Sequence, residues 1–269
     1  MEITVVIPTY NREDLISRSI DSIIAQESEE CKILVVDDCS TDGTGRIIHT
    51  YEEKYGDRVK YYRLDKNSGP AAARNMGARL AETEWIAFND SDDVWHKDKL
   101  KKQAAYYESH SDVDLIYSGY RGYHESGEIS TTPDRDLPYE LEGYIYSSLL
   151  VRNSIGAPTV LVKRDSFIEA GGFDEEYLCL EDWEFAIRFS SNHKIGFVDE
   201  DLVDAYISNS GVSCRISDYY ISRCQIVKDN LSGIMEYKLF DEIVGDIFER
   251  ANRRGILDQV QMIMESMLK

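Results

Sequence analysis

Strand-like apolar runs alternate with helical segments from the start of the chain to Trp95, and this alternation constrains the fold most. The expected strands are Ile3–Ile7, Ile33–Val36, Val59–Leu64 and Trp85–Phe88. The expected helices are one after Asn11 as N-cap, one from the Asp37–Thr44 turn to about Tyr55, and one over Ala71–Leu80 after Pro70. Such alternation is typical of parallel βαβ units. It predicts a doubly wound, mostly parallel α/β sheet flanked by helices, with a ligand crevice at the carboxyl ends of the strands.

The rest of the chain is expected to complete the sheet and then to continue as helices only. The expected elements are a helix over Lys97–Ser109, a strand over Asp114–Tyr120, a mobile loop or hairpin over Gly122–Pro138, a strand over Pro158–Val162, a short helix over Arg164–Ala170 that ends at Gly171–Gly172, a helix over Asp182–Ser191, and strands over Ile195–Val198 and Leu202–Ile207. We therefore expect one domain over 1–215, with halves at 1–95 and 96–215, and a helical C-terminal extension over 216–269.

Composition narrows the class of protein. The 269 residues are 42% hydrophobic and 30% charged, which is typical of a soluble globular protein. No apolar run approaches the ~18 residues of a membrane-spanning helix, and no signal peptide is found, so we expect a cytoplasmic protein. The net charge of -20 argues against binding to nucleic acid or to an anionic membrane. The five cysteines are Cys31, Cys39, Cys179, Cys214 and Cys224, whose spacing favours reduced thiols over a disulfide framework or a zinc site.

Three carboxylates follow the predicted strand Trp85–Phe88, within the segment Asn89–Asp93. Alternation along an extended chain would point Asp90 and Asp92 the same way. Like charges ~4 Å apart repel by ~4 kcal/mol at an intermediate dielectric, and a divalent cation with oxygen ligands would offset that repulsion. A solvated acidic turn is the alternative interpretation. The position at the end of a buried strand favours the cation site, because ligands of open α/β sheets bind there.

Six short motifs occur in a fixed order and coincide with the predicted strand ends and loops. They are Val6–Arg12, Val35–Thr44, Asn67–Asn75, Asp90–Asp93, Gly171–Asp174 and Glu181–Trp183. In these residues the chain resembles a family 2 inverting glycosyltransferase, a nucleotide-diphospho-sugar transferase of the GT-A fold, from Ile3 to about Ser213. The resemblance implies that 1–95 is the nucleotide-binding half and that 96–215 is the acceptor-side half.

The resemblance also implies a nucleotide site. Its residues would be Pro8, Thr9, Tyr10, Arg12, Asp38, Gly69, Arg74, Asp90 and Ser91. Thr9 and Tyr10 would flank the base, and Asp38 would accept a hydrogen bond from the base imide N–H. That bond selects uracil, because cytosine has no proton at N3 and would leave the carboxylate unpaired. The alternative for Asp38 is an Asx-turn residue. Gly69 would let the backbone approach the ligand, and Arg74 would reach the nucleotide or pair with Asp90 or Asp92.

A metal and a catalytic base are implied in the same way. Asp90 would contact the ribose and Asp92 would bind the Mn²⁺ or Mg²⁺ that bridges the phosphates, with Asp93 as a third acid. A further ligand, commonly His, is absent from the segment 206–213, which leaves the ligand set incomplete. Asp182 fits the base position, where the helix dipole would keep it ionised. Alternatively, Glu181 and Asp182 are only favourable first-turn acids. The donor or acceptor sugar would contact Trp95, Phe173, Asp174, Glu181 and Trp183, although the aromatic residues suit the core equally.

The expected function is therefore that of a metal-dependent hexosyltransferase. It would move a sugar from a UDP-sugar, with inversion, to a hydroxyl of a saccharide, lipid-linked or protein-linked acceptor in cell-surface polysaccharide synthesis. Homo-oligomers could form through the C-terminal helices. One alternative is a haloacid-dehalogenase-type phosphatase, because Asp90–Val94 fits D-x-D-x-[TV] with Asp90 as nucleophile. That family places this loop after its first strand, which argues against it. The other alternative is a non-catalytic carbohydrate-binding scaffold on the same fold.

Overall fold

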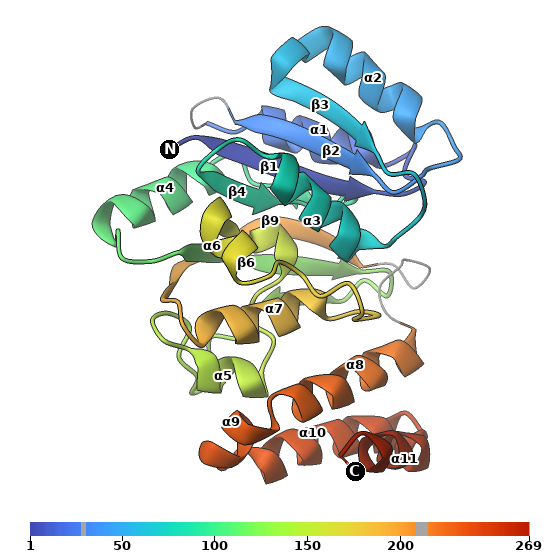
Figure 1. Ribbon diagram of the computed structural model, residues 1–269, viewed down its shortest axis with the longest axis vertical. Helices are drawn as coiled ribbons and strands as arrows, with labels where there is room; N and C mark the ends of the chain where they lie inside the picture. Colours follow the sequence, from blue (N-terminus) through green and yellow to red (C-terminus); the bar gives the residue numbers. More distant parts are fainter. Residues whose placement is uncertain (28–30, 208–214, 269) are drawn as a thin grey trace.

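The computed structural model describes residues 1–27, 31–207 and 215–268 and forms a mixed sheet flanked by helices (Figure 1). The strands are β1 (Ile3–Thr9), β2 (Lys32–Asp37), β3 (Val59–Arg63), β4 (Trp85–Phe88), β5 (Val94–Trp95), β6 (Leu115–His124), β7 (Ile129–Thr132), β8 (Leu161–Lys163) and β9 (Ile195–Ile207). The helices are α1 (Ile16–Ile24), α2 (Thr44–Tyr55), α3 (Pro70–Leu80), α4 (Lys99–Ser109), α5 (Tyr146–Val151), α6 (Arg164–Glu169), α7 (Glu181–Ser190), α8 (Ile216–Asp229), α9 (Leu231–Glu236), α10 (Phe240–Arg253) and α11 (Leu257–Leu268), with short 3-10 turns η1 (Gly56–Arg58) and η2 (Ala157–Thr159).

The first half has the predicted βαβ arrangement. The sheet order is β3-β2-β1-β4-β8-β6-β9-β5, with β7 beside β6, and β1 to β4 pair in parallel. Alternate residues of β1 face opposite cores: Val6 packs with α3 and α7, whereas Val5 and Ile7 pack with α1 and α2. Helices thus cover both faces, which confirms the doubly wound α/β prediction. The N-cap prediction for Asn11 is wrong, because α1 begins only at Ile16 and the Asn11 side chain instead accepts a hydrogen bond from the backbone N–H of Thr41 at 2.8 Å.

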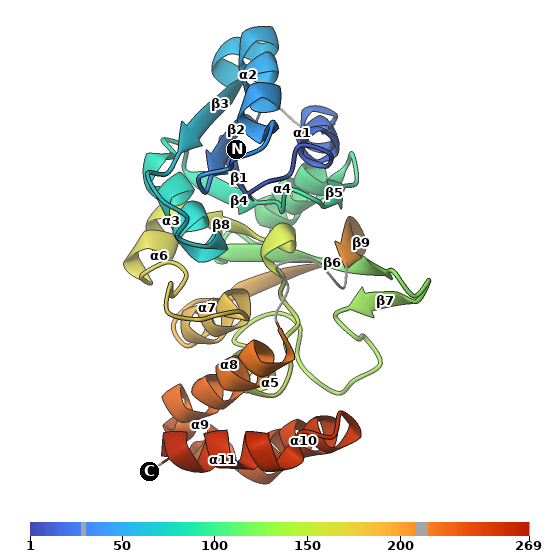
Figure 2. The ribbon, with the colours of Figure 1, turned by 90° about the vertical axis from the view of Figure 1, so that its right-hand side faces the viewer.

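The second half differs from the sequence expectation in detail. β8 is antiparallel to β4 and β6, whereas β6 and β9 pair in parallel across a bulge near Gly119. β9 is one strand where two were expected, and β5, α5 and η2 were not predicted. The segment Gly122–Pro138 does contain a hairpin, in which β7 pairs with the end of β6, as Figure 2 shows.

The C-terminal region is helical, as predicted, and it packs onto the sheet domain. Figure 1 shows α8 to α11 below α7, at the end of the molecule opposite α2, with α8 at about the height of α5. Their buried side chains, among them Tyr220, Ile226, Ile243 and Val260, join the same apolar core as Phe185 of α7. The helices therefore extend the core of the domain. No helix in the described part of the chain is long and apolar enough to cross a membrane.

The cysteine prediction is wrong at one position. Cys31, Cys39 and Cys224 are free thiols, but Cys179 is disulfide-bonded. Cysteines distant in sequence are brought together only by the fold, so their spacing along the chain does not reveal such a pair. Cys214 lies outside the described residues.

Candidate functional site

A cavity of about 590 Å³ opens at the carboxyl ends of β1, β2 and β4. Twelve of the predicted site residues line it: Pro8, Thr9, Tyr10, Arg12, Asp38, Gly69, Arg74, Asp90, Ser91, Asp92, Glu181 and Asp182. They come from both halves of the domain and lie up to 174 positions apart in the sequence, from Pro8 to Asp182. The fold therefore unites the nucleotide-binding and acceptor-side motifs in one concave site, the arrangement that a ligand pocket requires.

The end of the cavity at β1 and β2 offers unused hydrogen-bonding capacity. The Thr9 hydroxyl is buried and has no hydrogen-bond partner among the described residues. Asp38 is 4% exposed, and its two oxygens accept backbone N–H bonds from Ser68 at 2.6 Å and Gly69 at 2.8 Å. Burial raises the pKa of Asp38, and these two bonds oppose the rise. Each carboxylate oxygen has two lone pairs, so Asp38 retains capacity for one more donor.

The loop before α3 is shaped by Gly69. This residue has a φ of +90°, a conformation that side chains rarely tolerate, and its N–H points to Asp38. Pro70 then starts the helix at a position where no backbone donor is needed. Further along α3, a Cβ at Gly77 would lie 2.2 Å from Val6, so only glycine lets the helix sit this close to β1. Together these features bring the buried Arg74 into the floor of the cavity.

Arg74 joins the two halves of the site. Its guanidinium donates to Asp90 at 2.5 Å and to Glu181 at 2.8 Å, and its Nε has no hydrogen-bond partner within residues 1–27, 31–207 and 215–268. Of the two roles that the sequence left open, pairing with Asp90 is therefore present. A buried arginine with two carboxylates fixes their separation, since charge-assisted bonds of this kind are short and directional. The acidic turn and the start of α7 are thus held together through one side chain.

The acidic segment after β4 is a turn and not an extension of the strand. Strand geometry ends at Phe88, and the Asp93 N–H donates to the Asp90 carbonyl at 3.2 Å. The prediction that Asp90 and Asp92 alternate as in a strand is therefore wrong, although both line the cavity. Asp92 lies 3.7 Å from the Arg12 guanidinium, and Asp93 accepts a bond from the Tyr206 N–H at 3.2 Å.

These acids have room for one more positive charge. Burial, and then the charge of Asp90, raise the pKa of Asp92. Burial also raises the pKa of Asp93 well above its usual value, followed by the charges of Asp90 and Asp92. In the described ranges no three His, Cys, Asp or Glu side chains form a complete metal cluster. The residues therefore fit a divalent cation that takes ligands from a bound diphosphate as well, with Asp92 and Asp93 as the nearest protein carboxylates.

Asp182 is anchored in the wall of the cavity opposite the acidic turn. One carboxylate oxygen accepts the Ala157 N–H at 3.2 Å and the other accepts its neighbouring Trp183 N–H at 2.8 Å. Burial, and then the charge of Glu181, raise the pKa of Asp182 to about 7, while Arg74 opposes the rise. The prediction that the helix dipole keeps this residue fully ionised is therefore wrong, because desolvation outweighs the dipole. Leu180, just before it, has a left-handed φ of 63°.

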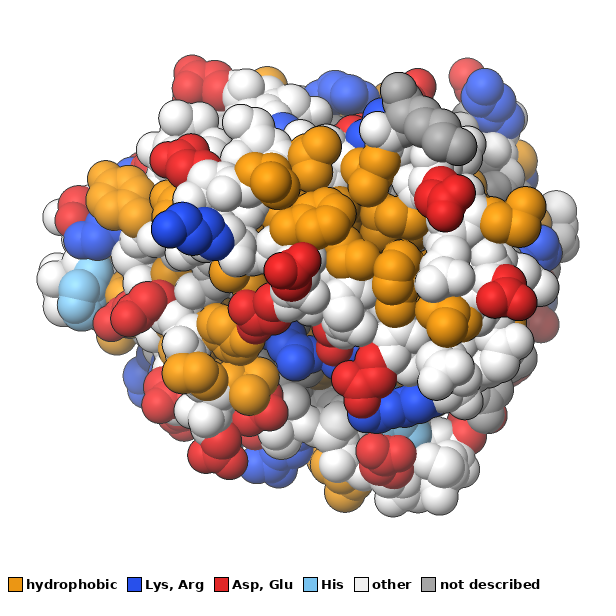
Figure 3. All heavy atoms as spheres, turned by 90° about the horizontal axis from the view of Figure 1, so that it is seen from below, with side chains coloured by type: hydrophobic (Ala, Val, Ile, Leu, Met, Phe, Trp, Pro, Cys, Tyr) orange, Lys and Arg blue, Asp and Glu red, His pale blue; other side chains and the backbone are white. Residues whose placement is uncertain are grey.

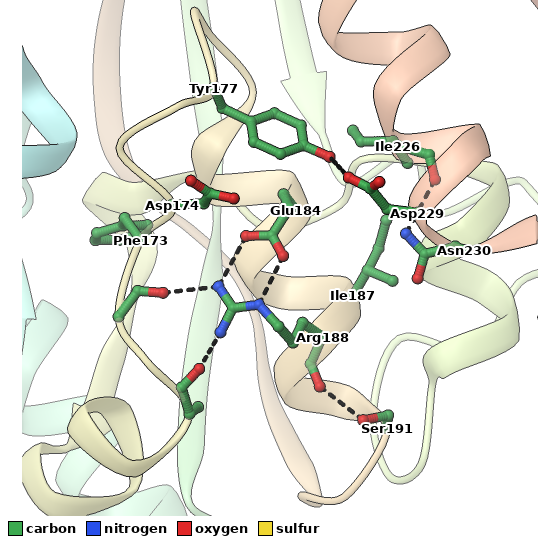
Figure 4. A network of polar contacts seen from close by, with 12 residues as sticks. Phe173, Asp174, Tyr177, Glu184, Ile187, Arg188, Ser191, Ile226, Asp229 and Asn230 are labelled. Carbon is green, nitrogen blue, oxygen red and sulfur yellow. Dashed lines mark hydrogen bonds and ion pairs between the residues drawn. The ribbon is translucent and has the colours of Figure 1, made fainter. Parts of the chain in front are cut away.

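The loop before α7 is held from both sides. Asn75 of α3 exchanges two hydrogen bonds with the Phe173 backbone, at 2.8 and 2.9 Å. Figure 4 shows Arg188 of α7 donating two hydrogen bonds to the Glu184 carboxylate, at 2.6 and 2.8 Å. The same guanidinium also donates to the carbonyls of Ala170 and Gly172. The Gly171–Asp174 motif thus acts as a support for α7.

Four predicted sugar contacts do not line the cavity. Trp95, Phe173 and Trp183 are 2 to 3% exposed, and the Trp95 and Trp183 indole N–H groups bond to backbone carbonyls. Asp174 is exposed and accepts the Glu176 N–H at 2.9 Å. The sugar-platform prediction for the three aromatic residues is therefore wrong, because all three pack in the core. Sequence reasoning missed the cavity residues Tyr120, Pro158, Leu178 and Tyr206, whose segments carry no recognisable motif.

Comparison with known proteins agrees with this site. The family model described as Glycosyl transferase family 2 matches residues 4–165. The glycosyltransferase TuaG of Bacillus subtilis (strain 168), named for teichuronic acid biosynthesis, is 36% identical over 163 residues, which are 61% of this chain and 62% of TuaG. The poly(ribitol-phosphate) beta-N-acetylglucosaminyltransferase TarS of Staphylococcus aureus (strain Mu50) is 42% identical over 263 residues, which are 93% of this chain and 44% of TarS.

A solved structure has the same fold. Staphylococcus aureus TarS 1-349 in complex with UDP-GlcNAc aligns with a TM-score of 0.68 and 22% identity, covering 99% of this chain and 91% of that one. The chain spans 62% of TuaG and 44% of full-length TarS, so both relatives are longer. The match to the family model covers more than half of the chain, and it includes the four motifs up to Asp93 but not Glu181–Trp183. The chain therefore belongs to glycosyl transferase family 2.

Proposed function

We propose that this chain transfers a sugar from a UDP-sugar to an acceptor hydroxyl, with inversion at the anomeric carbon. One observation carries the proposal: Asp38, the acidic turn and Asp182 line a single cavity, although they come from three separate segments. Asp38 and Thr9 would bind the base, Arg74 and Asp90 would border the ribose and diphosphate, and Asp182 would face the acceptor.

Asp182 would be the base that activates the acceptor hydroxyl. A sugar hydroxyl becomes a good nucleophile only when its proton is removed as it attacks, so a base must lie beside it. The carboxylate of Asp182 would take that proton, and a single displacement would invert the anomeric centre. The N–H groups of Ala157 and Trp183 hold its two oxygens in a fixed direction. A pKa near neutrality suits this role, because the carboxylate is then both available and basic.

A divalent cation would complete the donor side. Asp92 and Asp93 would hold Mn²⁺ or Mg²⁺, which would stabilise the negative charge of the departing diphosphate. Arg12, 3.7 Å from Asp92, would add a second positive charge at that position. The raised pKa values of Asp92 and Asp93 support this assignment, since a bound cation would offset both the desolvation of these carboxylates and the repulsion from Asp90.

The names of the relatives suggest the donor and the acceptor. TarS is named as an N-acetylglucosaminyltransferase, so UDP-GlcNAc is the first donor to try. TuaG is named for teichuronic acid and TarS for poly(ribitol-phosphate), so we propose a cell-surface polymer as the acceptor class. A lipid-linked or protein-linked glycan is the other acceptor to test. A cytoplasmic location stays a prediction.

The test is turnover of UDP-sugars by the chain. We expect slow release of UDP from one UDP-sugar with Mn²⁺, and faster release with the correct acceptor. Asp182→Asn should bind UDP normally but lose transfer by ~10²- to 10⁴-fold, because only the base is removed. Transfer retained by this variant would remove Asp182 from the mechanism. UDP binding without turnover of any donor would instead favour the carbohydrate-binding scaffold.

The phosphatase alternative is wrong. The chain belongs to family 2, and its D-x-D-x-V segment follows β4, the fourth strand of the chain, where the phosphatases place theirs after the first strand. These phosphatases also need a later acidic pair after a glycine. The nearest later Gly-Asp pair here, Gly245 and Asp246, lies within α10, and Asp246 is paired with arginine side chains.

A further inference from the structure

The C-terminal helices place a buried arginine against the residue that follows the proposed base. Arg223 of α8 is 4% exposed, and its guanidinium lies 5.1 Å from the ring centre of Trp183. Its Nη1 donates to Asp246 of α10 at 2.9 Å, whereas Nη2 has no hydrogen-bond partner among the described residues. A guanidinium over an indole face gains a cation–π attraction that strengthens when water is excluded. Arg223 is thus held between one carboxylate and one aromatic ring.

Asp246 pairs with arginine side chains from α8, α10 and the end of α5. Arg250 of α10 donates to both of its oxygens at 2.9 Å, and Arg152, at the end of α5, lies 3.8 Å away. Burial raises the pKa of Asp246, but the hydrogen bonds and charges of Arg250 and Arg223 outweigh burial and lower it. The carboxylate therefore stays charged at neutral pH and fixes the guanidinium of Arg223 in place. A buried arginine keeps such a partner because an unpaired buried charge is costly.

Trp183 contacts both Arg223 and Asp182 and so links the two residues. Its indole N–H donates to the Leu149 carbonyl of α5 at 2.7 Å, which fixes one edge of the ring, and Arg223 covers the ring itself. Its backbone N–H donates to the Asp182 carboxylate at 2.8 Å. Asp182 and Trp183 are adjacent in the first turn of α7, so a shift of Trp183 that moved its backbone would displace one of the two N–H groups that hold the Asp182 carboxylate.

We propose that Arg223, held by Asp246, is a positioning residue that acts through Trp183 to aim the carboxylate of Asp182 into the cavity. The inference rests on the proposed function for the role of Asp182. It gives the C-terminal helices a part in catalysis, although none of their residues lines the described cavity.

The first test is Arg223→Met, which keeps the length and packing of the side chain but removes the charge. We expect kcat to fall by ~10- to 100-fold, since a small misplacement of a reacting group has an effect of that size. The KM for the UDP-sugar and the Kd for UDP should stay within about twofold, because the nucleotide residues lie on other elements. Arg223→Lys should recover only part of the loss, because lysine lacks the planar fork. Arg253→Met is the matched control, since Arg253 is 73% exposed and pairs with Glu249 of its own helix.

A second readout does not depend on turnover. The pKa of Asp182, followed by carboxyl carbon NMR, should fall toward its ordinary value in Arg223→Met, because a looser Trp183 admits water to the carboxylate. Glu181 and Arg74, the other charged groups that face Asp182, are unchanged in this variant. If Arg223→Met alters the pKa of Asp182 but the wild-type chain transfers no sugar, the positioning role is supported and the proposed function is refuted.

Two results would overturn the inference. One is an unchanged kcat and an unchanged Asp182 pKa in Arg223→Met. The other is a fall in kcat that is matched by an equal loss of UDP affinity and of folded protein, because a merely structural role moves all three together. In the Asp182→Asn background, Arg223→Met should cause no further loss of residual transfer, since the two residues act as one unit.

Discussion

The carboxyl group of Asp182 illustrates how local and tertiary effects compete at a single residue. Its place in the first turn of α7 favours the charged form through the helix dipole. The surrounding cavity wall and the neighbouring Glu181 favour the neutral form, and they prevail. The sequence allows the first effect to be predicted, because it needs only the position in the helix. The second depends on burial, which follows from contacts between distant segments and outweighs the hydrogen bond from Ala157 that favours the charged form.

The raised pKa of Asp182 predicts a pH dependence. A base with a pKa of about 7 is mostly protonated below that value, so kcat should rise about tenfold per pH unit up to pH 7 and then level off. The measurement is kcat against pH between 5 and 9 at saturating donor. A profile that is flat from pH 5 to 7 would mean that Asp182 is not the base or that a bound donor lowers its pKa.

Asp38 predicts base selectivity. Asp38→Asn removes one acceptor oxygen and adds an amide donor, which can pair with N3 of cytosine but not with the uracil imide. We expect UDP affinity to fall by ~10- to 100-fold, the loss of a charge-assisted bond, and the preference for UDP over CDP to shrink. Calorimetry with both nucleotides measures this. Asp57→Asn is the control, because the Asp57 side chain is fully exposed. Unaltered selectivity would show that Asp38 only anchors the loop at Ser68 and Gly69.

At the scale of elements, the sequence predicts the first half of the fold better than the second. β1, β2 and β4 are buried on both faces, so their apolar runs stand out in the sequence. β9 instead continues through Asp199, Glu200 and Asp201, which local propensity excludes from a strand. Arg135 pairs with Asp199 and Asp201, so an ion-pair partner 64 positions away permits the acidic stretch. No single-sequence pattern reveals that partner.

The same limit applies to the site. The site residues of the nucleotide half were implied by the resemblance to the family, and the position of their motifs at the ends of apolar strands agreed with it, because ligands of open sheets bind there. Trp183 was assigned to the sugar because exposed and buried aromatic residues look alike in a sequence. Its burial follows from α5 and α8, which pack against it. Tyr120 and Leu178, conversely, enter the cavity from segments with no motif.

The support of α7 gives a prediction about stability. Arg188→Met removes the guanidinium that joins Glu184 to the carbonyls of Ala170 and Gly172 (Figure 4). We expect the free energy of unfolding to fall by ~1 to 3 kcal/mol, because Glu184 is buried and would lose its partner. Denaturant titration measures the loss. Arg253→Met, which removes an exposed pairing with Glu249, is the comparison. Equal stability of the two variants would contradict a supporting role for Arg188.

At the scale of the whole molecule, apolar side chains gather on one face. Figure 3 views the molecule from below, where α8 to α11 lie, and shows apolar side chains gathered near the centre of that face. Met262 of α11 is 72% exposed. A homo-oligomer through these helices stays a prediction. Light scattering should give a mass above the 30.9 kDa of one chain, and Met262→Lys should reduce it. A monomer at all concentrations would contradict it.

The overall charge bears directly on nucleotide binding. A net charge of -20 repels a diphosphate at long range, so binding requires positive charge inside the cavity. Arg74 is already paired with Asp90 and Glu181, and Arg12 lies beside Asp92. The account therefore requires a divalent cation to join the acids and the diphosphate, and nucleotide affinity should depend steeply on that cation.

Thermal melting with UDP and Mn²⁺ tests this central claim most directly. At a free UDP concentration 100 times Kd, binding adds ~2.7 kcal/mol of stability, which raises Tm by roughly 5 to 10 °C for a chain of this size. The rise should be smaller with CDP or GDP, and it should largely vanish without Mn²⁺ or in Asp92→Asn. A wild-type chain whose Tm is the same with every nucleotide, with and without Mn²⁺, would contradict the account.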